Sequence, residues 1–135
     1  MTQVKTAPTI PKELSVNADV ALAFLELAAS GRGQEALDRY GGLEFRHHNT
    51  FFAGDGETLV AAMDEDAQTH PGKRLEVLRI ISEGQYVAIH SKVTGSTDRD
   101  LATVHIFRID DGKILELWDV AQEAMANSPN QYGMF

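Results

Sequence analysis

The spacing of apolar positions predicts three helices in the first half of the chain. Residues 20–28 are apolar on nearly every side, which is typical of a well-buried helix. Residues 34–40, bounded by glycines, predict a short second helix. Asp55 can cap a third helix, in which apolar residues recur at helical spacing from Leu59 onward and which ends at residues 70–72.

Alternation of apolar and polar positions predicts one strand before the third helix and four strands after it. These strands are residues 43–49, 75–83, 86–94, 101–109 and 114–120. An Asp-Gly pair, Asp111-Gly112, joins the last two strands and is a strong signal for a hairpin. Helices followed by an antiparallel meander indicate an α+β fold, a curved antiparallel sheet (cone or roll) wrapped by about three helices around a pocket.

Length and composition narrow the class of protein. The 135 residues suit one domain, and the absence of cysteine excludes disulfides and thiolate chemistry. A net charge of −8 argues against a nucleic-acid partner. No apolar run is long enough for a signal peptide or a membrane span, so we expect a cytoplasmic protein with no membrane partner. We expect residues 1–14 to be a flexible arm, 15–124 the domain and 125–135 a tail.

One hairpin is the most informative part of the sequence. Residues 104–120 read VHIFRIDDGKILELWDV, and this segment resembles the last hairpin of the SnoaL-like polyketide cyclase branch of the nuclear transport factor 2-like superfamily. His48-Asn49 and the strand segment 87–90 are similar to the same branch, although Leu117 stands where that branch usually has histidine, and Thr50 where it often has proline. The resemblance implies a SnoaL-like domain at 15–124 with a pocket enclosed by the sheet and the helices.

Strand alternation and this resemblance together suggest the site. The resemblance implies that His105 and Asp119 point into the pocket, with Asp119 as a catalytic acid/base and His105 as its catalytic partner. An aspartate among leucine and phenylalanine side chains is poorly solvated, which makes it a better base near neutral pH. The expected substrate-binding residues are His48, Asn49, His90, Phe107, Leu115 and Leu117.

The expected activity is that of a cofactor-independent lyase or isomerase on a small apolar carbonyl compound, through enolisation or aldol chemistry. The five histidines lack the spacing of helical zinc motifs, so we expect no metal. The alternative is a non-catalytic module that binds a small ligand or assembles as a homodimer through the outer face of the sheet. In that alternative Asp119 caps a turn or binds backbone amides, and His105 is a hydrogen-bonded interior group.

Overall fold

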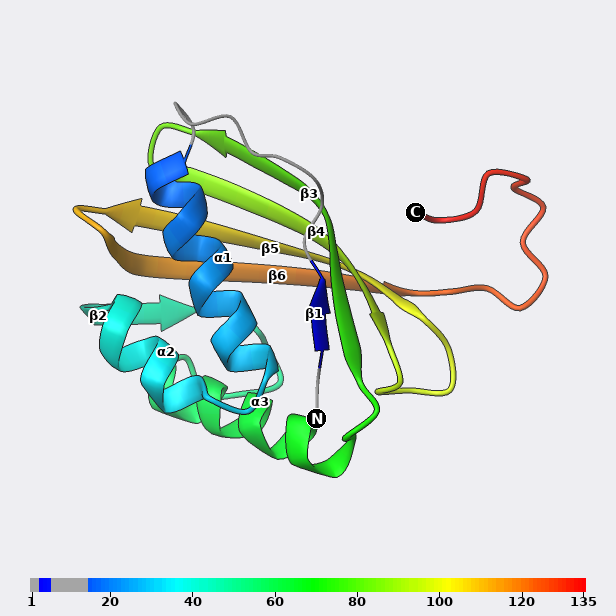
Figure 1. The fold of residues 1–135 in the computed structure, drawn as a ribbon, viewed down its shortest axis with the longest axis horizontal. Coiled ribbons are helices and arrows are strands. Elements are labelled where there is room, and N and C mark those ends of the chain that lie inside the picture. The colour runs from blue at the N-terminus through cyan, green and yellow to red at the C-terminus, as the bar shows by residue number, and fades with distance from the viewer. Residues whose placement is uncertain (1–2, 6–14) are drawn as a thin grey trace.

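The computed structural model describes residues 3–5 and 15–135 and places three helices on one face of a twisted sheet (Figure 1). The helices are α1 (Ser15–Ala29), α2 (Gly33–Tyr40) and α3 (Gly56–Thr69). The strands are β1 (Gln3–Lys5), β2 (Gly41–His47), β3 (Arg74–Glu83), β4 (Tyr86–Thr94), β5 (Leu101–Asp110) and β6 (Lys113–Glu123). The predicted α+β class and the wrapping helices are confirmed.

The sheet has six strands in the order β1-β3-β4-β5-β6-β2. Its centre, from β3 to β6, is the predicted antiparallel meander. Both edge strands pair in parallel, β1 with β3 and β2 with β6, so the sheet is mixed and does not close into a barrel. Three residues of the predicted arm form β1, while residues 1–2 and 6–14 of that arm lie outside the described residues.

The core lies between the inner face of the sheet and the helices. α1 crosses this inner face (Figure 1), which explains why its sequence is apolar on nearly all sides. Phe24 of α1 is fully buried, with its ring centroid 5.8 Å from Phe45 and 6.0 Å from Phe107. This aromatic cluster ties α1 to two strands at once.

The predicted Asp-Gly turn forms, and it is followed by a β-bulge. Asp111 and Gly112 have φ values of 48° and 75°, as a two-residue hairpin turn requires. Beyond the turn, Ile109 pairs with Ile114 but Arg108 pairs with Glu116, so one extra residue interrupts the ladder in β6. The bulge turns Ile114 into the core, where it is fully buried, and reverses the alternation that was expected from the sequence.

The C-terminal tail after β6 is mostly exposed. The tail after β6 runs beyond the sheet and folds back (Figure 1), and the Phe135 ring lies 4.9 Å from the ammonium of Lys92. In β2, Phe45 is buried whereas Leu43 is fully exposed, because the pairing of β2 with β6 shifts between Gly41 and Arg46. None of the described helices is long and apolar enough to cross a membrane.

The Phe24 cluster yields a test of the core. Replacing Phe24 by alanine should lower the free energy of unfolding by about 3–5 kcal/mol, because it leaves a cavity between α1 and the sheet. Urea unfolding followed by circular dichroism measures this change. Val16→Ala, on the exposed side of the same helix, is the control and should shift stability by less than about 0.5 kcal/mol. Equal effects of the two substitutions would contradict this account of the core.

Candidate active site

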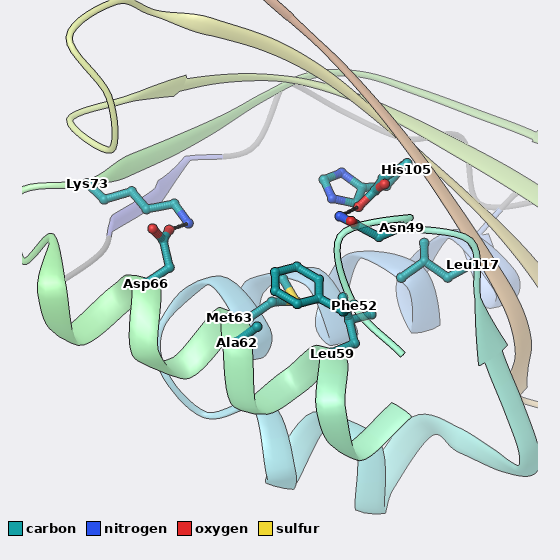
Figure 2. A pocket seen from close by; sticks show the side chains of 10 residues that line it. Asn49, Phe52, Leu59, Ala62, Met63, Asp66, Lys73, His105 and Leu117 are labelled. Carbon is teal, nitrogen blue, oxygen red and sulfur yellow. Dashed lines mark hydrogen bonds and ion pairs between the residues drawn. The ribbon is translucent and has the colours of Figure 1, made fainter. Parts of the chain in front are cut away.

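A cavity of about 230 Å³ lies between α3 and the inner face of β5 and β6. It is lined by Asn49, Phe52, Leu59, Ala62, Met63, Asp66, Lys73, His105, Leu117 and Asp119. Figure 2 shows the side chains of Asn49 and His105 close together on the sheet side, with apolar side chains of α3 facing them. The cavity is therefore mostly apolar and has polar groups at particular points, as small-molecule sites usually do.

A second cavity, of about 360 Å³, adjoins the first. It is lined by His48, Asn49, Thr50, Phe51, Thr103, His105, Asp119, Val120 and Ala121. Three residues line both cavities, namely Asn49, His105 and Asp119. A ligand in either cavity would therefore meet the same polar group of side chains.

The parallel pairing of β2 with β6 brings Asn49 to Asp119. His47 lies opposite Leu117 in the register, and the next backbone amide, that of His48, donates to the Leu117 carbonyl at 2.9 Å. The chain then leaves the sheet, and Asn49 Nδ2 donates a hydrogen bond to Asp119 Oδ2 at 3.0 Å. Two residues 70 positions apart in sequence thus meet at the floor of both cavities.

His47 holds Asn49 in place from behind. Its Nδ1 accepts a hydrogen bond from the Asn49 backbone amide at 3.1 Å, and its Nε2 lies 2.6 Å from the Ala53 carbonyl oxygen. A carbonyl only accepts, so the hydrogen of the buried ring is on Nε2. Asn49 Oδ1 accepts from the Phe51 amide at 3.0 Å, which leaves the amide NH₂ of Asn49 for Asp119.

His105 lies directly across the β5–β6 pair from Asp119. Its ring packs on Phe107, with centroids 6.3 Å apart, and its buried Nδ1 has no hydrogen-bond partner among the described residues. Burial lowers the pKa of His105, the nearby Asp119 carboxylate opposes this, and the positive charge of Lys73 lowers it further. A protonated ring would need an acceptor at both nitrogens, so the geometry also favours a neutral imidazole at pH 7.

Two buried hydroxyls continue the polar strip along the inner face. Thr103 of β5 and Ser91 of β4 are paired across the strands, one row beyond His105. Neither side-chain oxygen has a hydrogen-bond partner among the described residues. Thr103 also lines the second cavity, although its hydroxyl oxygen is itself buried.

Comparison with known proteins gives the family. The model of the SnoaL-like domain family matches residues 21–117, which is most of the chain. The protein belongs to the SnoaL-like family. No protein of curated function matches this SnoaL-like chain.

Solved structures share the fold of this SnoaL-like domain at low sequence identity. A candidate polyketide cyclase from Bacillus cereus has a TM-score of 0.70 at 22% identity, over 88% of this chain and 83% of that one. A candidate SnoaL-like polyketide cyclase from Jannaschia sp. has 0.69 at 15% identity, over 85% and 91%. AclR from Streptomyces galilaeus, a candidate hydroxylase, has 0.65 at 19% identity, over 81% and 90%. These likenesses establish the fold.

Four of the residues expected at the site line the first cavity, the one between α3 and the inner face of β5 and β6. They are Asn49, His105, Leu117 and Asp119. His48 lies at the second cavity, but its ring faces the outside, where Nε2 is 2.5 Å from Glu116 Oε2 and the ring stacks on Trp118 at 5.1 Å.

Three residues that were expected to bind the substrate line neither cavity. His90 lies on the outer face of β4, where its Nδ1 is 2.8 Å from an Arg79 guanidinium nitrogen. Phe107 faces inward but is covered by Phe24 and lines neither cavity. Leu115 is the extra residue of the bulge and packs close to Gly42 at the sheet edge, so it is not in the pocket.

Glu116 marks the outer face of β6, opposite the cavity. Its carboxylate accepts from Arg46, His48 and Arg108, and these hydrogen bonds lower the pKa of Glu116 to about 2. Arg46 and His48 come from β2 and the residue just after it, so the cluster fastens β2 to β6. It thereby supports the pairing that delivers Asn49.

Sequence reasoning missed several residues of the site. His47 could have been found, because a histidine two positions before an asparagine in a strand-to-loop segment can receive the backbone amide of that asparagine. Lys73 and Asp66 could not have been found from the sequence, because they meet only through the turn that follows α3. Within the described residues, no group of three or more histidine, aspartate or glutamate side chains is arranged to hold a metal ion.

The lowered pKa of His105 predicts a pH dependence of stability. Below the ordinary histidine pKa of about 6.5, the unfolded chain gains a proton that the folded protein resists, so the free energy of unfolding falls as pH falls. The extra loss should reach at most about 1.4 kcal/mol per pH unit below that point. His105→Gln should show a flatter profile between pH 7.5 and 5.5 in urea unfolding. Parallel profiles of the two proteins would contradict a neutral, buried His105.

Proposed function

We propose that this protein is a cofactor-independent acid/base enzyme that removes a proton next to the carbonyl of a small, largely apolar substrate. The observation that carries the proposal is the Asp119 carboxylate at the junction of the two cavities, held by Asn49 at 3.0 Å and paired across the strands with His105. A fixed carboxylate beside an apolar chamber is the arrangement that proton abstraction from carbon requires.

The two oxygens of Asp119 have different surroundings. Oδ2 accepts the hydrogen bond from Asn49, whereas Oδ1 has no hydrogen-bond partner among the described residues. Oδ1 is therefore the oxygen that takes the substrate proton in this proposal. Asn49 is a positioning residue, since it holds the carboxylate without contacting the reacting carbon, and His47 acts one step behind it.

The neutral His105 suits the second role. Removal of the proton leaves negative charge on the substrate oxygen, and an N–H group aimed at that oxygen stabilises the enolate. A neutral imidazole can donate such a hydrogen bond and later return a proton. For a 1,3-dicarbonyl compound, whose central carbon is already acidic, these two groups are sufficient for enolisation. Closure of an aldol ring would follow when the substrate carries a second carbonyl.

The comparisons support a carbonyl substrate without naming it. Two of the similar structures carry names of candidate polyketide cyclases, while AclR is named a candidate hydroxylase. Because one fold carries both names, the proposal rests on Asp119 and its neighbours rather than on the fold.

Solvent-deuterium incorporation tests the proposed chemistry without the natural substrate. A panel of small ketones and 1,3-dicarbonyl compounds is incubated with the protein in D₂O, and exchange at the acidic carbon is followed by proton NMR. Asp119→Asn should slow enzyme-dependent exchange at least about a hundredfold, because it removes the base while keeping the shape of the side chain.

The control for that experiment is Asp98→Asn, in the exposed loop before β5, which should exchange at the wild-type rate. Exchange that survives in Asp119→Asn would assign the base to another group. If the wild type exchanges none of the panel, the binding-module alternative gains over the enzyme.

A second candidate role, assembly into a homodimer, has its own observation. On the outer face of the sheet, the register aligns four apolar residues in one row across four strands: Ile81, Ala88, Ile106 and Trp118. Ile81 is 66% exposed, and Val120 in the next row is 65% exposed. A continuous apolar row on an open sheet face is typical of a surface that a partner covers, and a second copy of this chain is the partner we propose.

Mass measurement tests the dimer. Sedimentation equilibrium should give a mass near twice 14.8 kDa for the wild type and near 14.8 kDa for Ile106→Glu, because a carboxylate in the middle of the row would be buried without a partner. Gln34→Glu adds the same charge on the exposed side of α2 and should leave the mass unchanged. A wild type that sediments as a monomer at all accessible concentrations would remove this role.

A further inference from the structure

The first cavity, between α3 and the inner face of β5 and β6, has a second polar end, remote from the proposed base Asp119. Figure 2 shows Lys73 and Asp66 on one side of the pocket and Asn49 with His105 on the other, with Phe52 and Met63 between them. The stretch between the two ends is lined by apolar side chains, namely Phe52, Leu59, Ala62, Met63 and Leu117. A ligand that fills the cavity from Asp119 would reach Lys73.

The geometry around α3 holds this polar end in place. α3 ends at Thr69, and the turn that follows places the Lys73 amide 3.0 Å from the His70 carbonyl oxygen, so the chain reverses. Lys73 Nζ then lies 2.5 Å from Asp66 Oδ2, and His70 Nδ1 lies 3.1 Å from Asp66 Oδ1. Asp66 is thus held from two sides, and the Lys73 side chain is only 12% exposed.

An ammonium group has three N–H donors, and Asp66 accepts one of them among the described residues. Lys73 also lines the cavity, so a donor is available to a ligand. A purely apolar ligand would bury the cation against hydrocarbon and leave its remaining donors unsatisfied, which is costly. The end of the cavity therefore favours a ligand group that accepts a hydrogen bond.

The charges of the cavity indicate what kind of group this is. Lys73 is already balanced by Asp66, and Asp119 at the other end carries an unbalanced negative charge, so a ligand carboxylate gains little and is repelled by Asp119. A hydroxyl both accepts and donates, and it matches a neighbouring ammonium and carboxylate. The charge of Lys73 also lowers the pKa of His105, so the two ends lie within electrostatic reach of each other.

We propose that Lys73 and Asp66 are specificity residues that bind a hydroxyl at the far end of an uncharged, apolar carbonyl substrate. Lys73 donates to the hydroxyl oxygen, and Asp66 accepts the hydroxyl hydrogen. The inference rests on the proposed function only in placing the substrate carbonyl at Asp119. The substrate class is then a neutral hydroxy-ketone or hydroxy-1,3-diketone with an apolar middle.

Binding of matched synthetic probes tests this directly. The probes are linear 1,3-diketones of several chain lengths, each made with a terminal methyl, hydroxyl or carboxylate group. Their dissociation constants are measured by isothermal titration calorimetry with the full-length protein at pH 7.5. At the best chain length, the hydroxyl probe should bind about tenfold more tightly than the methyl probe, the increment of one hydrogen bond to a charged group.

Variants then locate the preference. Lys73→Met should abolish it by weakening the hydroxyl probe alone, whereas Lys73→Arg should keep part of it and Lys92→Met, on the outer face, should keep all of it. Asp66→Asn retains a hydrogen-bond acceptor and should keep most of the preference for the hydroxyl probe over the methyl probe. This variant provides a second measurement if Lys73→Met is unstable. Thermal unfolding of each variant reports on folding independently.

The outcomes separate this inference from the proposed chemistry. Equal binding of methyl and hydroxyl probes, tighter binding of the carboxylate probe, or no binding at any chain length would overturn it. So would an equal loss of all probes in a folded Lys73→Met. A hydroxyl preference that persists in Asp119→Asn while deuterium exchange is absent from every protein would uphold the recognition site and refute the enzyme.

Discussion

The pairing of β5 with β6, including its one-residue bulge, determines where Asp119, His105 and Glu116 point. Side chains alternate across a strand, so one extra residue reverses the faces on either side of it. Before the bulge Ile114 faces the core, and after it Leu117 and Asp119 face the cavity while Glu116 faces out. The same register places Asp119 opposite His105, so backbone hydrogen bonds alone bring the carboxylate and the imidazole together.

The edge strand β2 completes the site because it runs parallel to β6. Because the two strands run in the same direction, the segment that follows β2 leaves the sheet alongside the later residues of β6. Asn49 therefore lies beside Asp119. The cluster of Arg46 and Arg108 on Glu116 secures this pairing from the outer face. The ion cluster on the outer face and the hydrogen bond between Asn49 and Asp119 thus both depend on the pairing of β2 with β6. Weakening the ion cluster should therefore loosen that hydrogen bond.

Much of this arrangement follows from alternation in the sequence, and the failures have identifiable causes. Alternation alone places His90 on the face of β4 opposite the buried Ile89; the resemblance, rather than the residues, suggested that His90 lined the pocket. The bulge turns Leu115 away from the cavity, and no residue type indicates a bulge in advance. Phe107 faces inward but is covered by α1, and strand alternation does not describe the packing of a helix. The parallel edges and the approach of Lys73 to Asp66 depend on tertiary placement, so no local pattern could give them.

Different interactions position the two walls of the cavity. Main-chain hydrogen bonds position the strand wall, and side-chain packing positions the helix wall, so the two walls can change independently. Asp119 and His105 stand on central strands whose positions are set by main-chain hydrogen bonds, so their mutual geometry tolerates substitution around them. Ala62, Met63 and Asp66 stand on α3, which is placed by side-chain packing and by its cap at Asp55. Substitutions on α3 can therefore reshape the far end of the cavity without moving the proposed base.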